Sequence, residues 1–164
     1  MRIRPTARLL VLDDQQRLLL FHIHDTAPLH EGFPAMTIYW CTPGGGVESD
    51  ETFEQAAQRE LWEEAGIELA TVGPCVWHYQ RVLSGSTGSV QLHERFFLVS
   101  VPNASVSLAN MLAYEQKTHR AYRWWTRLEL EQSRESFVPP ELARFLAPLL
   151  DSAIPSSPVH LHAE

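Results

Sequence analysis

Three acidic side chains recur at helical spacing in the first half of the sequence. Glu60, Glu63 and Glu64 occupy positions i, i+3 and i+4 of a segment with the periodicity of an amphipathic helix. At roughly 100° per residue, Glu60 and Glu64 fall within about 20° of Phe53, on the face that should be buried. Like charges this close repel one another, and burying them unpaired is costly. The spacing indicates either a cation site or an acidic helix with a solvated face.

The residues around these carboxylates indicate which cation they could hold. Oxygen-only ligands favour Mg²⁺, with Mn²⁺ as a substitute, over zinc or copper. Arg59 precedes Glu63 by four residues and can pair with it, but one guanidinium cannot neutralise three carboxylates. Upstream, the run Pro43-Gly44-Gly45-Gly46 gives the backbone a freedom that side chains would deny it. We therefore predict a magnesium site formed by a glycine loop and the helix that follows it.

The helix that would carry these side chains has recognisable ends. Thr52, with Gln55 three residues later, fits a capping box, and Gly66 suits a C-terminal stop. Apolar residues recur every four positions and predict a core-facing stripe of Phe53, Ala57, Leu61 and Ala65. A helix between Thr52 and Gly66 is therefore expected.

Short β-prone runs surround this helix. We expect a hairpin and further strands at residues 7–12, 17–24, 37–40, 67–72, 75–83, 90–101 and 122–126. Loops at 25–36 and 104–118 are candidate substrate-contacting segments. A helical segment is expected from Pro139 to Leu150. The pattern predicts a single domain over residues 1–151 and a flexible C-terminal tail over 152–164.

Composition narrows the class of protein. With 164 residues and 45% hydrophobic side chains, the chain has the size and composition of one globular domain. Its 20 acidic against 13 basic side chains argue against a partner that is duplex nucleic acid. Two cysteines, and no apolar run near the roughly 20 residues of a membrane span, indicate a cytoplasmic protein without a membrane partner. A small phosphorylated partner remains compatible, because a metal ion can supply positive charge locally.

The spacing of the central segment also matches a known family pattern. It reads Gly45, five residues, Glu51, seven residues, Arg59-Glu60-Leu61, one residue, Glu63-Glu64, one residue, Gly66-Ile67. This resembles the Nudix box at every position. The resemblance implies an α/β fold, namely an α/β/α sandwich with a mixed sheet and a loop–helix–loop catalytic motif. Flanking segments are similar to those of many Nudix hydrolases, so the resemblance covers residues 4–150.

The resemblance further implies an activity and roles for the box residues. Nudix hydrolases typically use magnesium to cleave the diphosphate of a nucleoside diphosphate linked to another moiety. By position, Glu60, Glu63 and Glu64 would ligate the metal. Glu63 or Glu64 would also orient or deprotonate the attacking water, and Arg59 would fix a box glutamate by ion pairing. The chain would then be a Nudix-type pyrophosphohydrolase, an acid anhydride hydrolase.

Four further positions are candidates for the same site. By the same resemblance, Glu51 would assist through a metal-bound water, and the backbone at Gly45 would come close to metal and phosphate. Many Nudix enzymes complete the site with a glutamate outside the box. Glu94 and Glu115 could each supply it, although each also suits a surface position.

The sequence does not fix the residues that bind the substrate. Arg81 and Arg95 are candidates for phosphate contacts or surface charges. Aromatic residues that could stack on a base, or equally pack in the core, are Phe33, Tyr39 and Trp77. The expected partner is a small nucleoside diphosphate derivative, and the expected assembly is a monomer or homodimer. Two other functions remain open: a nucleoside triphosphate pyrophosphohydrolase that cleans the nucleotide pool, and a non-catalytic nucleotide-binding Nudix module.

Overall fold

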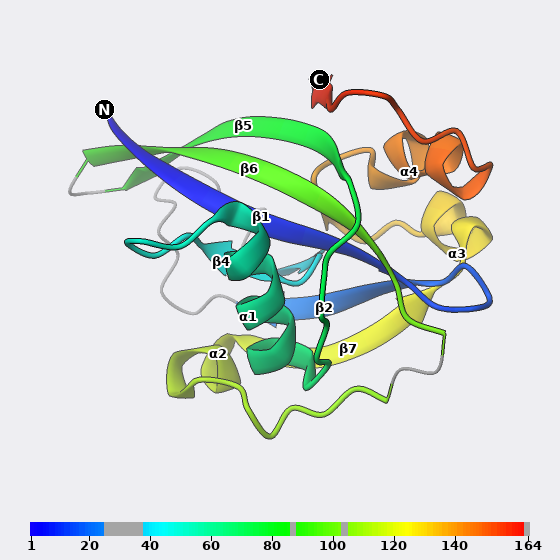
Figure 1. Cartoon of the computed structure of the whole chain (residues 1–164), viewed down its shortest axis with the longest axis horizontal. Coiled ribbons are helices and arrows are strands. Elements are labelled where there is room, and N and C mark those ends of the chain that lie inside the picture. Colours follow the sequence, from blue (N-terminus) through cyan, green and yellow to red (C-terminus); the bar gives the residue numbers. More distant parts are fainter. Residues whose placement is uncertain (25–37, 86–87, 103–104, 163–164) are drawn as a thin grey trace.

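The computed structural model describes residues 1–24, 38–85, 88–102 and 105–162. In chain order the elements are β1 Arg2–Leu12, β2 Leu18–His24, β3 Ile38–Cys41, β4 Gly44–Gly46, α1 Phe53–Ala65, β5 Cys75–Gly85, β6 Gly88–Ser100, α2 Ala113–Thr118, β7 His119–Trp125, α3 Arg127–Gln132, β8 Phe137–Val138, α4 Leu142–Leu150 and β9 Val159–Leu161. The strands form one mixed sheet with helices against both faces, so the predicted α/β/α arrangement is confirmed (Figure 1). No helix in this described part is long and apolar enough to cross a membrane.

Strand β1 lies at the centre of the sheet. It runs parallel to β6 along its whole length, from Arg2 opposite Val90 to Leu12 opposite Ser100. It also pairs antiparallel with β2 and with the short β4, which confirms the expected hairpin. The order along the sheet is β8-β3-β2-β1-β6-β5-β9, with β7 beside β2. Because β1 and β2 are covered on both faces, their apolar runs are nearly continuous.

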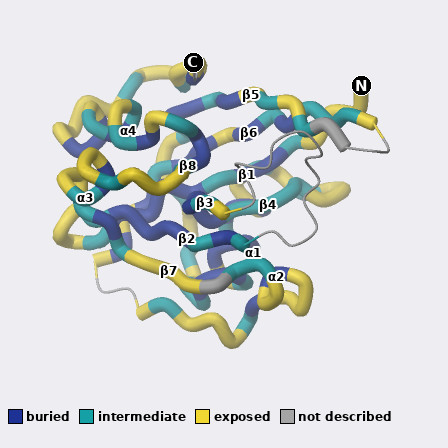
Figure 2. Tube along the Cα trace, turned by 180° about the vertical axis from the view of Figure 1, so that it is seen from behind, coloured by how far each residue is buried: buried dark blue, intermediate teal, exposed yellow. Residues whose placement is uncertain are grey.

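Two apolar layers cover the two faces of this sheet. On one face, α1 contributes Ala57 and Leu61 to a core shared with β1, β2 and β6. On the other, α4 contributes Leu142 and Leu146 to a core that includes Trp125. Figure 2 shows the strands buried between these layers, while the outer sides of the helices are exposed. A carboxylate carried into this interior is therefore stable only with a partner.

Helix α1 follows the prediction at both ends. Thr52 accepts a hydrogen bond from the Gln55 amide at 3.1 Å, and Gln55 accepts one from the Thr52 amide at 2.9 Å, which completes the capping box. Gly66 ends the helix in the left-handed conformation, with φ of 66°. Glu60 and Glu64 are buried, as their angular position predicted. The helix thus carries two carboxylates into the interior.

Several segments differ from the sequence-based expectation. Gly44–Gly46, expected to be part of a loop, pairs with β1 as the short strand β4. Residues 67–72 form no strand, and α2 lies within a stretch that was expected to be an irregular loop. Within the expected flexible tail, β9 pairs in parallel with β5. A six-residue helix and a three-residue strand are too short to show a period, and both depend on the elements they pack against. The expected loop at 25–36 lies outside the described residues, and the domain boundary at residue 151 stays a prediction.

Candidate active site

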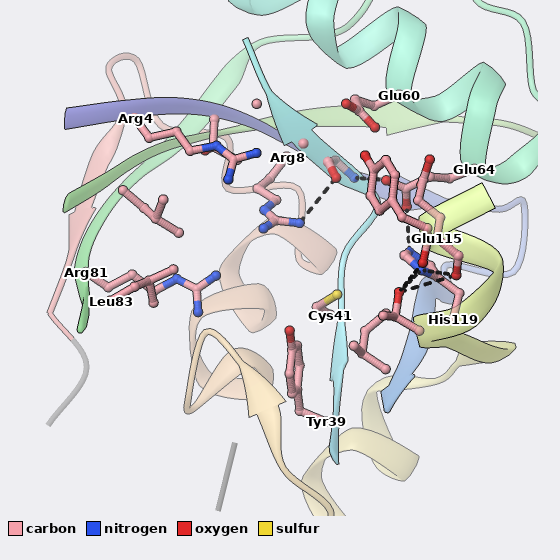
Figure 3. Close-up of a pocket in the computed structure, with 18 residues that line it drawn as sticks. Arg4, Arg8, Tyr39, Cys41, Glu60, Glu64, Arg81, Leu83, Glu115 and His119 are labelled. Atoms are coloured by element: carbon pink, nitrogen blue, oxygen red, sulfur yellow. Dashed lines mark hydrogen bonds and ion pairs between the residues drawn. The ribbon is translucent and has the colours of Figure 1, made fainter. Parts of the chain in front are cut away.

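A cavity of about 240 Å³ lies where α1, β1 and β4 meet α2 (Figure 3). Acidic residues of α1 and α2 line one side, and arginines of β1 and β5 line the other. Figure 3 shows the two groups on opposite sides of the cavity, with Cys41 and Tyr39 between them. We call them the carboxylate wall, formed by Glu60, Glu64 and Glu115, and the arginine wall, formed by Arg4, Arg8 and Arg81.

The carboxylate wall is buried and strongly perturbed. At most 5% of each of its three glutamates is exposed. Burial raises the pKa of Glu60 to about 7, and repulsion by Glu64 adds to the shift. Burial also raises the pKa of Glu64 to about 8, with repulsion by Glu115 as the next cause. The pKa of Glu115 is raised as well, by burial and then by Glu60. The wall therefore holds more potential negative charge than nearby cations offset.

Arg59 ties four box residues together beside the cavity. Its guanidinium donates to Glu51 at 2.8 and 3.0 Å and to Glu60 at 2.8 Å. It also donates to Glu63 at 3.3 Å and to the Gly46 carbonyl oxygen at 2.9 Å. Neither Glu51 nor Glu63 lines the cavity. The predicted residues are thus divided, since Glu60 and Glu64 face the cavity while Glu51 and Glu63 pair with Arg59 outside it.

The glycine strand β4 lets the backbone approach these carboxylates. A Cβ at Gly44, where φ is +149°, would overlap the Ala7 carbonyl oxygen of β1. A Cβ at Gly45 would overlap the carboxylate of Glu60. The Gly44 amide also donates to Glu64 Oε1 at 3.3 Å. Glycine at position 45 therefore lets α1 place Glu60 directly against β4, and glycine at position 44 lets β4 lie close to β1.

His119 lies beside the carboxylate wall, although the sequence-based prediction did not include it. Its Nδ1 lies 3.0 Å from the Glu115 carbonyl oxygen. The same nitrogen lies 3.1 Å from Thr118 Oγ1. On the other side of the ring, Nε2 lies 3.5 Å from Glu64 Oε2. No sequence signal marks His119, since only the placement of α2 and β7 brings it to the wall.

The carboxylate wall fits a divalent cation. One ligand atom each from Glu64, Glu115 and His119 lie within 4.8 Å of one another. Glu60 pairs with Arg59, but neither Glu64 nor Glu115 has an arginine or lysine within ion-pair distance among the described residues. Buried oxygen ligands short of positive charge are the donor set that magnesium or manganese binds.

Glu94 lies behind the arginine wall and does not line the cavity. Arg8 Nε donates to its Oε1 at 2.9 Å, and Arg81 Nε donates to its Oε2 at 3.0 Å. Burial opposes ionisation of Glu94, yet the two arginines together hold its pKa below the ordinary value. Of the two glutamates considered outside the box, only Glu115 is therefore placed beside Glu60 and Glu64.

The other substrate-binding candidates have different environments. Arg81 and Tyr39 line the cavity. Arg95 lies 4.1 Å over the ring of Phe53, away from the cavity lining. Trp77 is buried in the core beneath α4. Phe33 lies outside the described residues. Arg81 and Tyr39 therefore remain the candidates for contact with a substrate.

Comparison with known proteins identifies the family. A model of the NUDIX domain matches residues 2–149, which is most of the chain. The chain belongs to the Nudix family. The resemblance seen in the box is thereby confirmed, and it extends through the flanking strands to α4.

Individual Nudix relatives match over different lengths. The CTP pyrophosphohydrolase of Escherichia coli (strain K12) is 44% identical over 72 residues, which cover 37% of this chain and 53% of that protein. The chain thus matches about half the length of this curated relative. The solution structure of the E. coli ORF135 protein has 27% identity and a TM-score of 0.58 over 96% of both chains. The crystal structure of a MutT protein from Methanosarcina mazei Go1, with 18% identity and a TM-score of 0.64, shares the fold over 92% of this chain and 94% of that one.

Proposed function

We propose that this Nudix chain is a metal-dependent pyrophosphohydrolase that cleaves a diphosphate linkage in a small nucleotide. One observation carries the proposal: three buried carboxylates from two helices face a single cavity without enough positive charge to offset them. Such a site favours a divalent cation, and a cation bound there would attract the phosphates of a nucleotide. Membership of the Nudix family supports the same type of reaction.

The carboxylate wall would hold the metal. Glu60, Glu64 and Glu115 would bind magnesium, or manganese in its place, with His119 Nε2 beside them. When bound, the metal would make a water molecule more acidic and offset the charge that gathers on the leaving oxygen. Glu63, predicted as a ligand from its place in the box, would act from outside the cavity through Arg59.

The side chains of the protein would hold the reacting groups in place. Arg59 fixes Glu60 by a 2.8 Å hydrogen bond, and the Gly44 amide fixes Glu64 Oε1. Glu64 lines the cavity and burial raises its pKa to about 8, so this carboxylate would orient the attacking water and accept its proton. Glu63 is bound to Arg59 instead. Between the two glutamates considered as the base, the geometry therefore favours Glu64.

Two substrate classes fit this chemistry. A nucleoside diphosphate linked to another moiety is the class that the Nudix resemblance implies. A nucleoside triphosphate is favoured by a specific observation, because the 44% identical segment belongs to a protein named CTP pyrophosphohydrolase. Both classes present a diphosphate to the carboxylate wall, and they differ in what lies beyond it.

A turnover assay over a substrate panel tests the proposal. The panel contains nucleoside diphosphate sugars, dinucleotides and nucleoside triphosphates, each assayed with Mg²⁺, with Mn²⁺ and with a chelator. We expect metal-dependent cleavage in at least one class, and its loss in Glu64→Gln. Binding of nucleotides without turnover of any of them would contradict the proposal and would support the non-catalytic binding module.

A further inference from the structure

The arginine wall carries charge that the hydrolysis proposed above does not use. Arg4 and Arg8 come from β1 and Arg81 from β5, and all three line the cavity. We propose that this wall is a subsite for an anionic phosphate that is not cleaved, and that Glu94 is the positioning residue that aims two of its arginines. This inference rests on the proposed function. It places the substrate among nucleotides with a phosphate beyond the scissile diphosphate.

The subsite is built on three adjacent strands. Glu94 of β6 lies between Arg8 of β1 and Arg81 of β5, and all three side chains share one face of the sheet. Glu94 is 2% exposed and accepts from both guanidinium groups, through Arg8 Nε at 2.9 Å and through Arg81 Nε at 3.0 Å. A buried carboxylate held from two sides fixes the planes of both guanidinium groups.

Donors on both arginines remain available to a ligand. Within the described part of the chain, Arg8 Nη1 makes only long contacts, 3.4 and 3.5 Å, with the carbonyl oxygens of Thr42 and Gly44. Arg8 Nη2 and Arg81 Nη1 have no hydrogen-bond partner among the residues that the structure describes. An arginine carries five N–H donors in a rigid fork, and this geometry suits the oxygens of a phosphate.

The net positive charge of the arginine wall favours an anionic ligand over a neutral base. One carboxylate, Glu94, faces Arg8 and Arg81, so one positive charge is left over. Arg4 adds another; it is exposed and has no ion-pair partner in the described part of the chain. A base bound at this wall would leave both charges without a counter-ion, whereas a phosphate offsets them. The ion pairs with Glu94 therefore offset only part of the positive charge of the arginine wall.

The two walls meet at β4. A Cβ at Gly45 would overlap the Glu60 carboxylate, while a Cβ at Gly46 would lie 3.1 Å from Arg4 Nε. Neighbouring residues of one strand thus contact opposite walls, and their Cα atoms are about 3.8 Å apart. A phosphate at the arginine wall would therefore be close in the substrate to the diphosphate at the carboxylate wall. The third phosphate of a nucleoside triphosphate, or a phosphate on a short linked moiety, meets this requirement.

Steady-state kinetics of arginine variants test the subsite. Arg4→Gln removes an exposed side chain that has no ion-pair partner among the described residues, so the fold should be retained. Arg81→Gln and Arg81→Lys probe the half-buried guanidinium group that pairs with Glu94. Each is compared on a nucleoside triphosphate, on a nucleoside diphosphate linked to an uncharged sugar, and on one linked to a phosphorylated sugar. Arg144→Gln, at an exposed arginine of α4 outside the cavity, is the matched control.

We expect a rise in KM that depends on the substrate. Arg81→Gln should raise KM roughly tenfold for substrates with the extra phosphate, which is the scale of a hydrogen bond to a charged group. Arg4→Gln should raise it several-fold, and Arg81→Lys should restore part of the loss. With the uncharged sugar, the rise in KM should be clearly smaller than with the phosphate-bearing substrates, and kcat should change less than KM. The phosphate-bearing substrate that shows the effect identifies whether the phosphate comes from a triphosphate or from the linked moiety.

The positioning role of Glu94 has its own readout. Glu94→Gln should reproduce the substrate-selective rise in KM, whereas a structural role alone would change kcat and KM for all substrates alike. Equal rises in KM for charged and uncharged substrates, or no rise in Arg4→Gln and Arg81→Gln, would overturn the proposal.

A binding measurement separates this inference from the proposed function. Inorganic phosphate is titrated into the full chain with a chelator present, and binding is followed by calorimetry or amide NMR shifts. The wild type and Arg144→Gln should bind it weakly, and Arg4→Gln and Arg81→Gln should bind it at least several-fold more weakly. Absence of hydrolysis of every nucleotide would contradict the proposed function. The phosphate titration would still test the subsite in that case. Identical phosphate affinity in all four proteins would refute it.

Discussion

Glu64 and Glu94 are two buried glutamates near one cavity, with opposite electrostatic environments. Glu64 is 3% exposed and Glu94 is 2% exposed. Burial raises the pKa of Glu64 to about 8, whereas two arginines hold the pKa of Glu94 below its ordinary value. The difference lies in the partners, because Glu94 accepts from Arg8 and Arg81 while the nearest basic side chain of Glu64 is His119 at 3.5 Å.

This contrast shows how burial can reveal a ligand. At Glu94 the protein itself supplies the positive charge that a buried carboxylate requires, so the group is structurally complete. At Glu64 no arginine or lysine of the described residues lies within ion-pair distance, and repulsion by Glu115 adds to the effect of burial on its pKa. A fold that keeps such an arrangement implies a cation from outside the chain. Buried acidic residues are therefore informative about function when their counter-charges are counted.

The largest expected effect is on stability, at Glu94. Glu94→Gln should lower the free energy of unfolding by about 3 kcal/mol, because removing one partner of a buried ion pair leaves Arg8 and Arg81 without their counter-charge. Urea unfolding of the metal-free protein at pH 7 would measure it. Glu54→Gln, at an exposed position of α1, is the control and should be neutral. Equal stability of the two variants would show that the ion pairs contribute little.

Substitution of Glu64 should reduce activity and leave the fold intact. Glu64→Gln should reduce kcat at least about 100-fold, since a lost metal ligand removes several kcal/mol of transition-state stabilisation. Circular dichroism should show an intact fold. Glu63→Gln, whose carboxylate pairs with Arg59 outside the cavity, should lose less activity than Glu64→Gln. The reverse order would move the catalytic role to Glu63.

Adjacent glycines of β4 offer a smaller and more selective test. Gly45→Ala should push the Glu60 carboxylate aside and lower kcat about tenfold, because small misplacements of catalytic groups are costly. Gly46→Ala meets the guanidinium of Arg4 instead, so its effect should appear mainly in KM for phosphate-rich substrates. Kinetics of the two variants on one substrate make the comparison. Identical profiles would show that the two walls do not act separately.

The smallest expected effect is a pH dependence of the metal-free protein. The pKa values of Glu60 and Glu64 rise from 4.5 to about 7 and about 8 in the fold. Their protonated forms therefore give stability that is complete below pH 4.5 and is lost as the pH rises through about 7 and about 8.

Thermal melts from pH 5 to pH 9 in a chelator would show this fall, and Glu64→Gln should flatten it. Added Mg²⁺ should reverse the trend, because the metal binds the deprotonated carboxylates. A melting temperature that rises with pH in the chelator would contradict the assignment of a charge deficit to this wall.

Much of the fold could be predicted from the sequence, because the signals for those elements lie within the segments that form them. Helix α1 carries its own signals, since the capping box of Thr52, the four-residue apolar stripe and Gly66 all lie within the segment they define. The strands β1, β2, β5 and β6 are long enough to show β-prone runs. By contrast, α2 and β9 are specified by the elements they touch, and a single sequence shows no such contacts.

The candidate site was predictable to the same extent. The angular position of Glu60 and Glu64 on α1 correctly indicated that both are buried, and their role as metal ligands stays a prediction. The sequence could not choose between Glu94 and Glu115, because the choice depends on which arginines the sheet register brings near each of them. No sequence signal marked His119 as a site residue. It lies beside the carboxylate wall because β7 begins directly where α2 ends.

The two ends of the sheet have a consequence for behaviour at high concentration. The path begins at β8, which has two residues, and ends at β9, which has three. An outer strand this short offers few free backbone groups to another molecule at these two ends. Without β9, the eleven-residue strand β5 would become the outer strand. The pairing at Val159–Leu161 covers Trp77, His78 and Tyr79 of β5, and it thus shortens the edge that this strand could offer to a second molecule.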